Sequence, residues 1–146
     1  QLGAFLIQRC NAFARGAALV GCKRHPMDAA LRRAYCSPYD SPKNRLATLR
    51  FVQDIPLQPG DTSYALVSEV EQGLERFADR PMAIFWGEKD FVFDHHFRRE
   101  WQRRFPAAEL HSYPDAGHYV LEDAGDLIIP LIRQFLQQHP LGSEAA

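Results

Sequence analysis

Two short segments that read as strands, separated by one helical segment, constrain this sequence most. Residues 82–86 and 109–113 read as strands, and the residues from Asp94 to about Arg104 read as a helix between them. A strand, a helix and a second strand of this length form a unit with parallel strands and a right-handed crossover. A last helix is predicted to reach Gln138. The predicted fold class is therefore α/β, with a strand–helix–strand–helix unit of parallel strands.

Polar side chains follow both predicted strands. The turn 86–90 ends in Asp90, and the loop 115–123 carries His118. Because the carboxyl ends of parallel strands meet at one edge of a sheet, we expect Asp90 and His118 to lie side by side. A carboxylate can orient an imidazole, and a neutral imidazole can take a proton from water or a hydroxyl group. Asp90 and His118 are therefore the candidate catalytic residues, with Glu88 as a weaker acid. A turn-forming aspartate and an exposed loop histidine are the simpler alternatives.

Two adjacent histidines, His95 and His96, follow Asp94 and raise the question of a metal site. Neighbouring positions on a helix point about 100° apart, and no second ligand pair with metal-binding spacing is present. We interpret Asp94 as a helix N-cap and predict neither a metal nor a cofactor. Glu122 and Asp123 are interpreted as acids near a helix N-terminus, where the dipole favours negative charge.

The part of the chain before the first strand is predicted to be helical. The expected helices are residues 2–22, a helix with Pro26 at its first position, a helix opened by Pro42 that ends before Asp54, and residues 62–77. Turn residues fill positions 56–60, so we place a boundary there. The predicted domains are a helical cap at 1–56 and a core part at 57–146, with a frayed end after His139.

Charge and cysteine content limit the possible partners. The net charge of −1 with interspersed acids and bases argues against a nucleic-acid partner. Residues 2–22 are interrupted by polar side chains, so no transmembrane segment is predicted. Three cysteines without a zinc-binding spacing fit a reducing compartment, and we expect a cytoplasmic location.

Two motifs resemble those of a known superfamily. Trp86-Gly87-x-x-Asp90 and Ala116-Gly117-His118-Tyr119-x-x-Glu122-Asp123 resemble the acid and histidine motifs of the α/β-hydrolase superfamily, in its haloalkane dehalogenase and epoxide hydrolase branch. The order in that superfamily is nucleophile, acid, histidine, so the resemblance implies that Asp90 is the acid and His118 the base. The nucleophile elbow, Gly-x-[Ser/Asp]-x-Gly, occurs nowhere in the 146 residues, and the first residue is not Met. We therefore expect the C-terminal part of such a hydrolase, inactive by itself.

The helical region narrows the resemblance further. Residues 35–45 and 51–56 resemble the lid of the β-lactone decarboxylases of bacterial long-chain olefin biosynthesis. This resemblance implies an aspartate nucleophile that forms a covalent ester and a cis-β-lactone that loses carbon dioxide. The substrate would be small and apolar or lipid-like, and its pocket would have apolar walls. The side chains that would line the pocket, or else form helix–helix core, are Phe5, Leu6, Phe13, Phe51 and Val52.

Two alternatives remain open. The parent enzyme could be a haloalkane dehalogenase or an epoxide hydrolase, or the chain could be a non-catalytic protein-binding domain on a hydrolase scaffold. A two-stranded sheet has open edges, so association into a homo-oligomer is also possible.

Overall fold

The computed structural model describes residues 2–140 and divides the chain into two compact units. The helical unit comprises Gln1–Val20 and Met27–Ala78, and the sheet unit comprises Gly21–Pro26 and Asp79–Ala146. The domain limits 1–56 and 57–146 stay a prediction, and the frayed end expected after His139 falls almost entirely outside the described residues.

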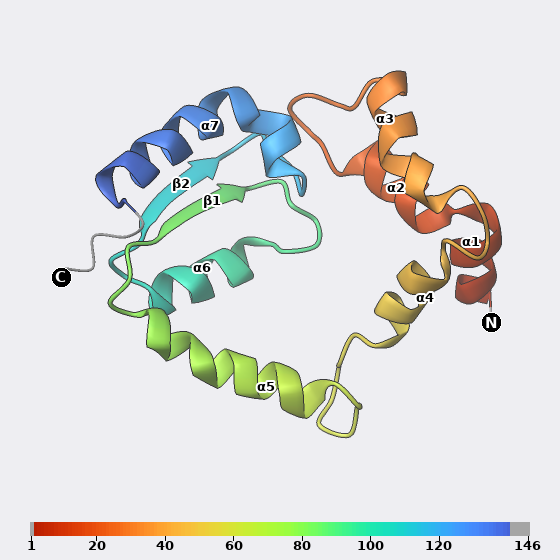
Figure 1. Ribbon diagram of the computed structural model, residues 1–146, viewed down its shortest axis with the longest axis horizontal. Coiled ribbons are helices and arrows are strands. Elements are labelled where there is room, and N and C mark those ends of the chain that lie inside the picture. Colours follow the sequence, from red (N-terminus) through yellow and green to blue (C-terminus); the bar gives the residue numbers. More distant parts are fainter. Residues whose placement is uncertain (1, 141–146) are drawn as a thin grey trace. The chain divides into compact units, whose positions relative to one another are not determined.

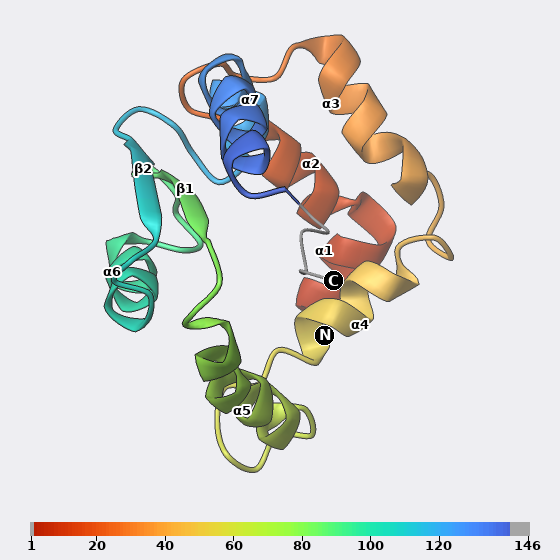
Figure 2. The ribbon, with the colours of Figure 1, turned by 60° about the vertical axis from the view of Figure 1, so that its left-hand side comes forward.

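The helical unit contains five α-helices and two 3₁₀ turns in the described residues. Helix α1 packs against α2 and α4, and α2 packs against α3 (Figure 2). The elements are α1 (Leu2–Cys10), α2 (Ala12–Val20), α3 (Ala29–Cys36), η1 (Ser37–Tyr39), α4 (Leu46–Gln53), α5 (Tyr64–Gly73) and η2 (Leu74–Phe77).

The predicted helix at 2–22 is wrong in one respect, because it is split at Asn11. Asn11 has a φ of 54°, in the left-handed region that ends a right-handed helix. Its carbonyl oxygen then accepts the Arg15 N–H at 3.1 Å and starts α2. Asparagine is one of the few residues other than glycine that takes this conformation readily, which explains the break.

The two helix starts predicted at prolines are also wrong. Helix α3 begins after Asp28, whose carboxylate accepts the Leu31 N–H at 2.8 Å as an N-cap. This cap, and not Pro26, sets the start because it satisfies an otherwise unpaired amide of the first turn. Pro42 lies in a turn, and α4 begins only at Leu46. The predicted end of α4 before Asp54 is confirmed.

Arg45 holds the start of α4 in place through main-chain carbonyl groups. Its guanidinium donates to the carbonyl oxygens of Tyr39 at 2.7 Å and Asp40 at 3.0 Å. It also donates to those of Gln8 and Arg9, both at 3.1 Å, at the end of α1. The last carbonyls of a helix lack partners within the helix, so one side chain satisfies α1 and anchors the turn before α4.

The sheet unit confirms the α/β fold class. Strands β1 (Ala83–Gly87) and β2 (Glu109–Tyr113) pair in parallel, with Ala83 opposite Glu109 and Gly87 opposite Tyr113. Helices α6 (His95–Arg104) and α7 (Val120–Gln138) lie on opposite sides of the strand pair (Figures 1 and 2). Strand β2, the end of α6 and the end of α7 match the predicted limits, and β1 is shifted by one residue.

The core of the sheet unit forms between the strands and α7. It consists of Tyr113, Ala116, Ala124 and Ile128, with Phe85, Val120 and Ile132 packed against them. Helix α7 is broken at Ala124, where φ is −139°, and Pro130 lies six residues further along. No helix within residues 2–140 has both the length and the apolar character that crossing a bilayer requires.

Candidate functional site

The turn after β1 is fastened to the end of β2. The Glu88 N–H donates to the Tyr113 carbonyl at 3.0 Å, and the Lys89 N–H donates to the Ala116 carbonyl at 2.9 Å. The Asp90 N–H closes the turn on the Gly87 carbonyl at 3.1 Å. These bonds place Asp90 beside the loop that follows β2.

Asp90 and His118 meet at this edge of the sheet, as predicted. The His118 Nδ1 atom lies 2.9 Å from Oδ2 and 3.0 Å from Oδ1 of Asp90. Asp90 Oδ1 also accepts the Val92 and Phe93 amides, at 2.8 and 3.0 Å. The carboxylate is therefore fixed by its own turn before it contacts the imidazole. The expected geometry is confirmed, and the catalytic role of the two residues stays a prediction.

Aromatic rings surround the His118 imidazole. The ring centroids of Phe91, Phe93 and Tyr119 lie 6.2, 5.6 and 5.5 Å from that of His118. The His118 side chain is 28% exposed and that of Asp90 is 10% exposed. A neutral imidazole that donates from Nδ1 to a carboxylate has Nε2 free to accept a proton. The arrangement suits a general base next to apolar surface.

Two glycines permit the close approach of the two loops. A Cβ atom on Gly87 would collide with the Gly117 carbonyl oxygen and lie 2.7 Å from that of Ala116. A Cβ atom on Gly117 would collide with the Gly21 carbonyl oxygen and lie 2.9 Å from Lys23 Cγ. The atoms that these Cβ atoms would meet are mostly main-chain atoms, so a larger residue at either position would push the loops apart.

Asp123 is the residue of this region whose importance the sequence analysis missed. It is fully buried, and its carboxylate accepts three main-chain amides, those of Lys23, His25 and Gly117, each at 2.6 Å. Burial pushes the pKa of this carboxyl up, but the amides of His25, Lys23, Gly117 and Arg24 outweigh burial and hold it below its ordinary value. The interpretation of Asp123 as an acid that only favours the helix dipole therefore underestimated its structural role. A hint was available, since Asp123 adjoins the apolar row Val120, Ala124, Ile128 and Ile132.

Glu88, the weaker candidate acid, is held by a different partner. Its Oε1 atom lies 2.9 Å from Arg98 Nε on α6. Both side chains are partly buried, with 26% of Glu88 and 19% of Arg98 exposed. Of the two acids in this turn, the structure brings Asp90 and not Glu88 to His118.

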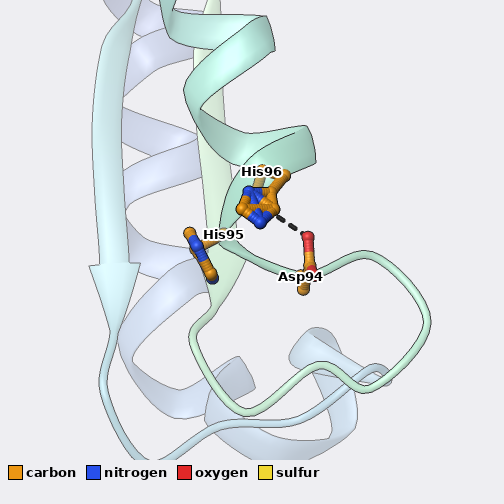
Figure 3. Close-up of side chains that lie close together, drawn as sticks. All are labelled: Asp94, His95 and His96. Atoms are coloured by element: carbon orange, nitrogen blue, oxygen red, sulfur yellow. Dashed lines mark hydrogen bonds between the residues drawn. The ribbon is translucent and has the colours of Figure 1, made fainter.

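The cluster Asp94, His95 and His96 is the group of described residues that could offer three ligands to a metal ion (Figure 3). Its ligand atoms lie within 4.8 Å of one another, and the two imidazole centroids are 4.0 Å apart. The expectation that the two histidines diverge was therefore wrong. The predicted N-cap is confirmed, because Asp94 accepts the His96 N–H at 2.9 Å. All three residues are exposed, and the positive end of a helix opposes a cation, so the cluster is better explained as a cap.

Comparison with known proteins relates the chain to one fold family. The model of the alpha/beta hydrolase fold family matches residues 17–125. The chain is 49% identical over 137 residues to the cis-3-alkyl-4-alkyloxetan-2-one decarboxylase of Shewanella oneidensis, which covers 94% of this chain and 43% of that protein. It is 48% identical over 141 residues to the protein of the same name from Xanthomonas campestris, covering 97% of this chain and 47% of that protein. The chain thus spans a little under half the length of these relatives.

Solved structures with similar folds include haloalkane dehalogenases. A loop variant of DbeA from Bradyrhizobium elkanii matches with a TM-score of 0.79 and 21% identity, over 94% of this chain and 45% of that one. DatA from Agrobacterium tumefaciens matches with a TM-score of 0.75 and 20% identity, over 93% of this chain and 46% of that one. At this identity the likeness concerns the fold alone.

Proposed function

The chain belongs to the alpha/beta hydrolase fold family, and on that premise we propose that Asp90 and His118 are the acid and base of a catalytic triad. The observation that supports this proposal is the contact of 2.9 Å between His118 Nδ1 and Asp90 Oδ2. Asp90 would hold the imidazole in one tautomer and stabilise its protonated form, while Nε2 takes the proton. The nucleophile would come from a segment that these 146 residues do not contain.

We propose that the complete enzyme decarboxylates cis-β-lactones. The support is the identity of 48–49% with proteins named cis-3-alkyl-4-alkyloxetan-2-one decarboxylase. On the chemistry implied by the resemblance, an aspartate carboxylate forms an ester with a ring carbon of the lactone as the bond of that carbon to the ring oxygen breaks. Loss of carbon dioxide would then expel the aspartate and leave the alkene, a sequence that consumes no water, and His118 would serve proton transfer. Haloalkane dehalogenation or epoxide hydrolysis is the alternative within the same fold.

The substrate we propose is small and apolar or lipid-like. Four of the five candidate lining residues of the helical unit are exposed, which argues against a plain core role: Phe5 at 57%, Leu6 at 41%, Phe13 at 44% and Phe51 at 64%. Near His118, Phe91 and Phe93 are 59% and 45% exposed. An alkyl chain would cover such side chains at a gain of about 25 cal/mol per Å² of apolar surface.

Location and assembly follow as lesser parts of the proposal. Cys10, Cys22 and Cys36 are all free thiols, which agrees with a reducing cytoplasm. The open edge of β1 offers a place where a further strand, from the same protein or from another copy, would pair.

A chimera tests the proposed activity. The part of the Xanthomonas campestris relative that aligns with this chain is replaced by this chain, and carbon dioxide and alkene release from a cis-3-alkyl-4-alkyloxetan-2-one are measured. We expect turnover by the chimera and none by the 146-residue chain alone. His118→Ala in the chimera should lower kcat by a factor on the order of 1,000 or more. His96→Gln, at an exposed histidine, is the matched control and should leave kcat unchanged.

Three results would overturn the proposal. They are turnover by the isolated chain, a His118→Ala chimera as active as its parent, and a chimera that hydrolyses haloalkanes or epoxides but leaves the lactone intact.

A further inference from the structure

A buried negative charge joins two segments that lie far apart in the sequence. Asp123 is 0% exposed, and the groups that bind its carboxylate in the structure are main-chain amides. Two of them, from Lys23 and His25, are 100 and 98 positions away, and the third belongs to Gly117. Charge-assisted bonds of this kind are about twice as strong as neutral ones. The carboxylate therefore acts as a clamp between the segment 21–25 and the loop that carries His118.

Hydrogen bonds hold the His118 loop on both sides of the histidine. On the preceding side, the Gly117 N–H donates to Asp123 Oδ2 at 2.6 Å. On the following side, the Tyr119 N–H donates to the Gly21 carbonyl at 3.2 Å, and Gly21 belongs to the segment that Asp123 holds. The His25 ring reinforces the contact, since its Nδ1 lies 2.7 Å from the Asp123 carbonyl oxygen. The amides of the two residues next to His118 are thus fixed, that of Gly117 by Asp123 and that of Tyr119 by the segment 21–25.

The segment 21–25 and the loop that carries His118 are closely packed. There is no room for a Cβ atom on Gly117 between the Gly21 carbonyl and the Lys23 side chain. Gly21, Ala116, Gly117 and Asp123 are all buried, whereas His118 itself is partly exposed. The main chain that carries the His118 imidazole is therefore held by packing and hydrogen bonds, and a displacement of that main chain would move the ring relative to Asp90.

We propose that Asp123 is a positioning residue for His118, which acts through the Gly117 and Gly21 peptide groups and does not touch the reacting atoms. The inference rests on the proposed function in that His118 is taken as the base. A purely structural carboxylate would stabilise the fold without affecting the imidazole. The two roles therefore differ in what happens to the His118 ring when the carboxylate is replaced in a chain that still folds.

Asp123→Asn is the discriminating change. The amide keeps the shape of the side chain, but its NH₂ group turns a donor toward main-chain donors and breaks at least one of the three bonds. Asp126→Asn, at an exposed acid on the same helix, is the matched control. Long-range ¹H–¹⁵N spectra of the 146-residue chain report the tautomer of each histidine ring, and circular dichroism reports the fold.

We expect His118 in the parent chain and in Asp126→Asn to be held as the Nδ1–H tautomer, and in Asp123→Asn to become a mixture of tautomers. In the chimera, Asp123→Asn should lower kcat on the order of 10- to 100-fold with little change in KM, because small displacements of a catalytic group have effects of this size. A folded Asp123→Asn chain with unchanged His118 signals would overturn the inference.

Hydrogen exchange of the parent chain decides the matter if Asp123→Asn does not fold. The amides of Lys23, Gly117 and Tyr119 should then exchange at one common rate, because opening the clamp releases all three. A Tyr119 amide that exchanges much faster than those of Lys23 and Gly117 would refute the positioning role. The ring spectra need no nucleophile, so they stand even if the chimera fails on the lactone. An active chimera with unmoved ring signals would overturn the positioning role alone.

Discussion

The two loops that bring Asp90 and His118 together are built in opposite ways. In the loop after β1, the Asp90 carboxylate binds the amides of Val92 and Phe93, two and three residues further on. The loop after β2 is held by Asp123, whose other partners, Lys23 and His25, lie about a hundred positions earlier. The Asp90 carboxylate therefore binds amides of its own turn, whereas the Asp123 carboxylate ties the His118 loop to a segment far away in the sequence. The comparison predicts that damage to the two loops will have unequal consequences.

The largest difference is expected between Asp123→Ala and Asp90→Ala. Removing the Asp123 carboxylate leaves three main-chain amides without their acceptor, that of Gly117 in a buried place and those of Lys23 and His25 in partly buried ones. At a cost of about 1–3 kcal/mol each, the free energy of unfolding should fall by about 3 kcal/mol or more. Val92 and Phe93 are exposed, so water can replace Asp90 on their amides. Asp90→Ala should therefore cost only about 1 kcal/mol, as the loss of a capping side chain does.

Urea unfolding measures both losses. Asp126→Ala on α7 is the control for replacing an acid on that helix. Equal losses for Asp123→Ala and Asp90→Ala would show that the two loops are not held differently.

The rate at which Cys22 is alkylated tests how often the segment 21–25 opens to solvent. Burial, and then the charges of Asp123 and Glu122, raise the pKa of the Cys22 thiol to about 11. Only the thiolate reacts with iodoacetamide, so at pH 8 Cys22 should be alkylated on the order of 100-fold more slowly than an ordinary exposed thiol. Mass spectrometry compares it with the exposed Cys10 in the same chain. Similar rates for the two would mean that the segment opens freely.

Acid should release the clamp that the Asp123 carboxylate forms. The pKa of Asp123 is lowered from 3.8 in the folded chain, so the unfolded chain binds the proton more readily. The stability that this carboxylate contributes is present above about pH 4 and is lost as the pH falls through the folded pKa. Urea unfolding at pH 7 and pH 3 should show a smaller loss in Asp123→Ala than in the parent. The pKa values of Asp61 and Glu100 are also lowered, so both proteins should still lose some stability at low pH. If the parent and Asp123→Ala lost the same free energy of unfolding between pH 7 and pH 3, Asp123 would not be the carboxylate responsible.

The smallest effect is expected at the end of β2, where Tyr113 leads into the His118 loop. Its hydroxyl is buried without a hydrogen-bond partner in the described structure, and burial raises its pKa. Tyr113→Phe removes a polar group that gains nothing from burial. The free energy of unfolding should stay constant or rise by up to about 1 kcal/mol. A clear loss of stability would mean that the hydroxyl does have a partner.

The same contrast explains which parts of the site could be predicted from the sequence. Asp90 follows a strand and precedes its own amide partners, so local pattern and parallel topology were enough to bring it to His118. The role of Asp123 depends on Lys23 and His25, and no local pattern connects residues separated by 98 and 100 positions. From the sequence, Asp123 could therefore be interpreted only as an acid near a helix start.

The fold shows the same division. The limits of strand β2 and helix α6 were predicted correctly, and for α6 the local signal is the Asp94 cap. The break at Asn11 was missed because one asparagine in an apolar stretch gives little warning that it will take a positive φ.

The bond between Lys23 and Asp123 also has a consequence for the order in which the protein is made. A ribosome releases the N-terminal residues first, and Asp123 emerges a hundred residues after Lys23. Closing a chain loop of this length carries an entropic penalty that must be met before the contact is rewarded. During synthesis the segment 21–25 therefore stays without its native partner until the first turn of α7 has been translated.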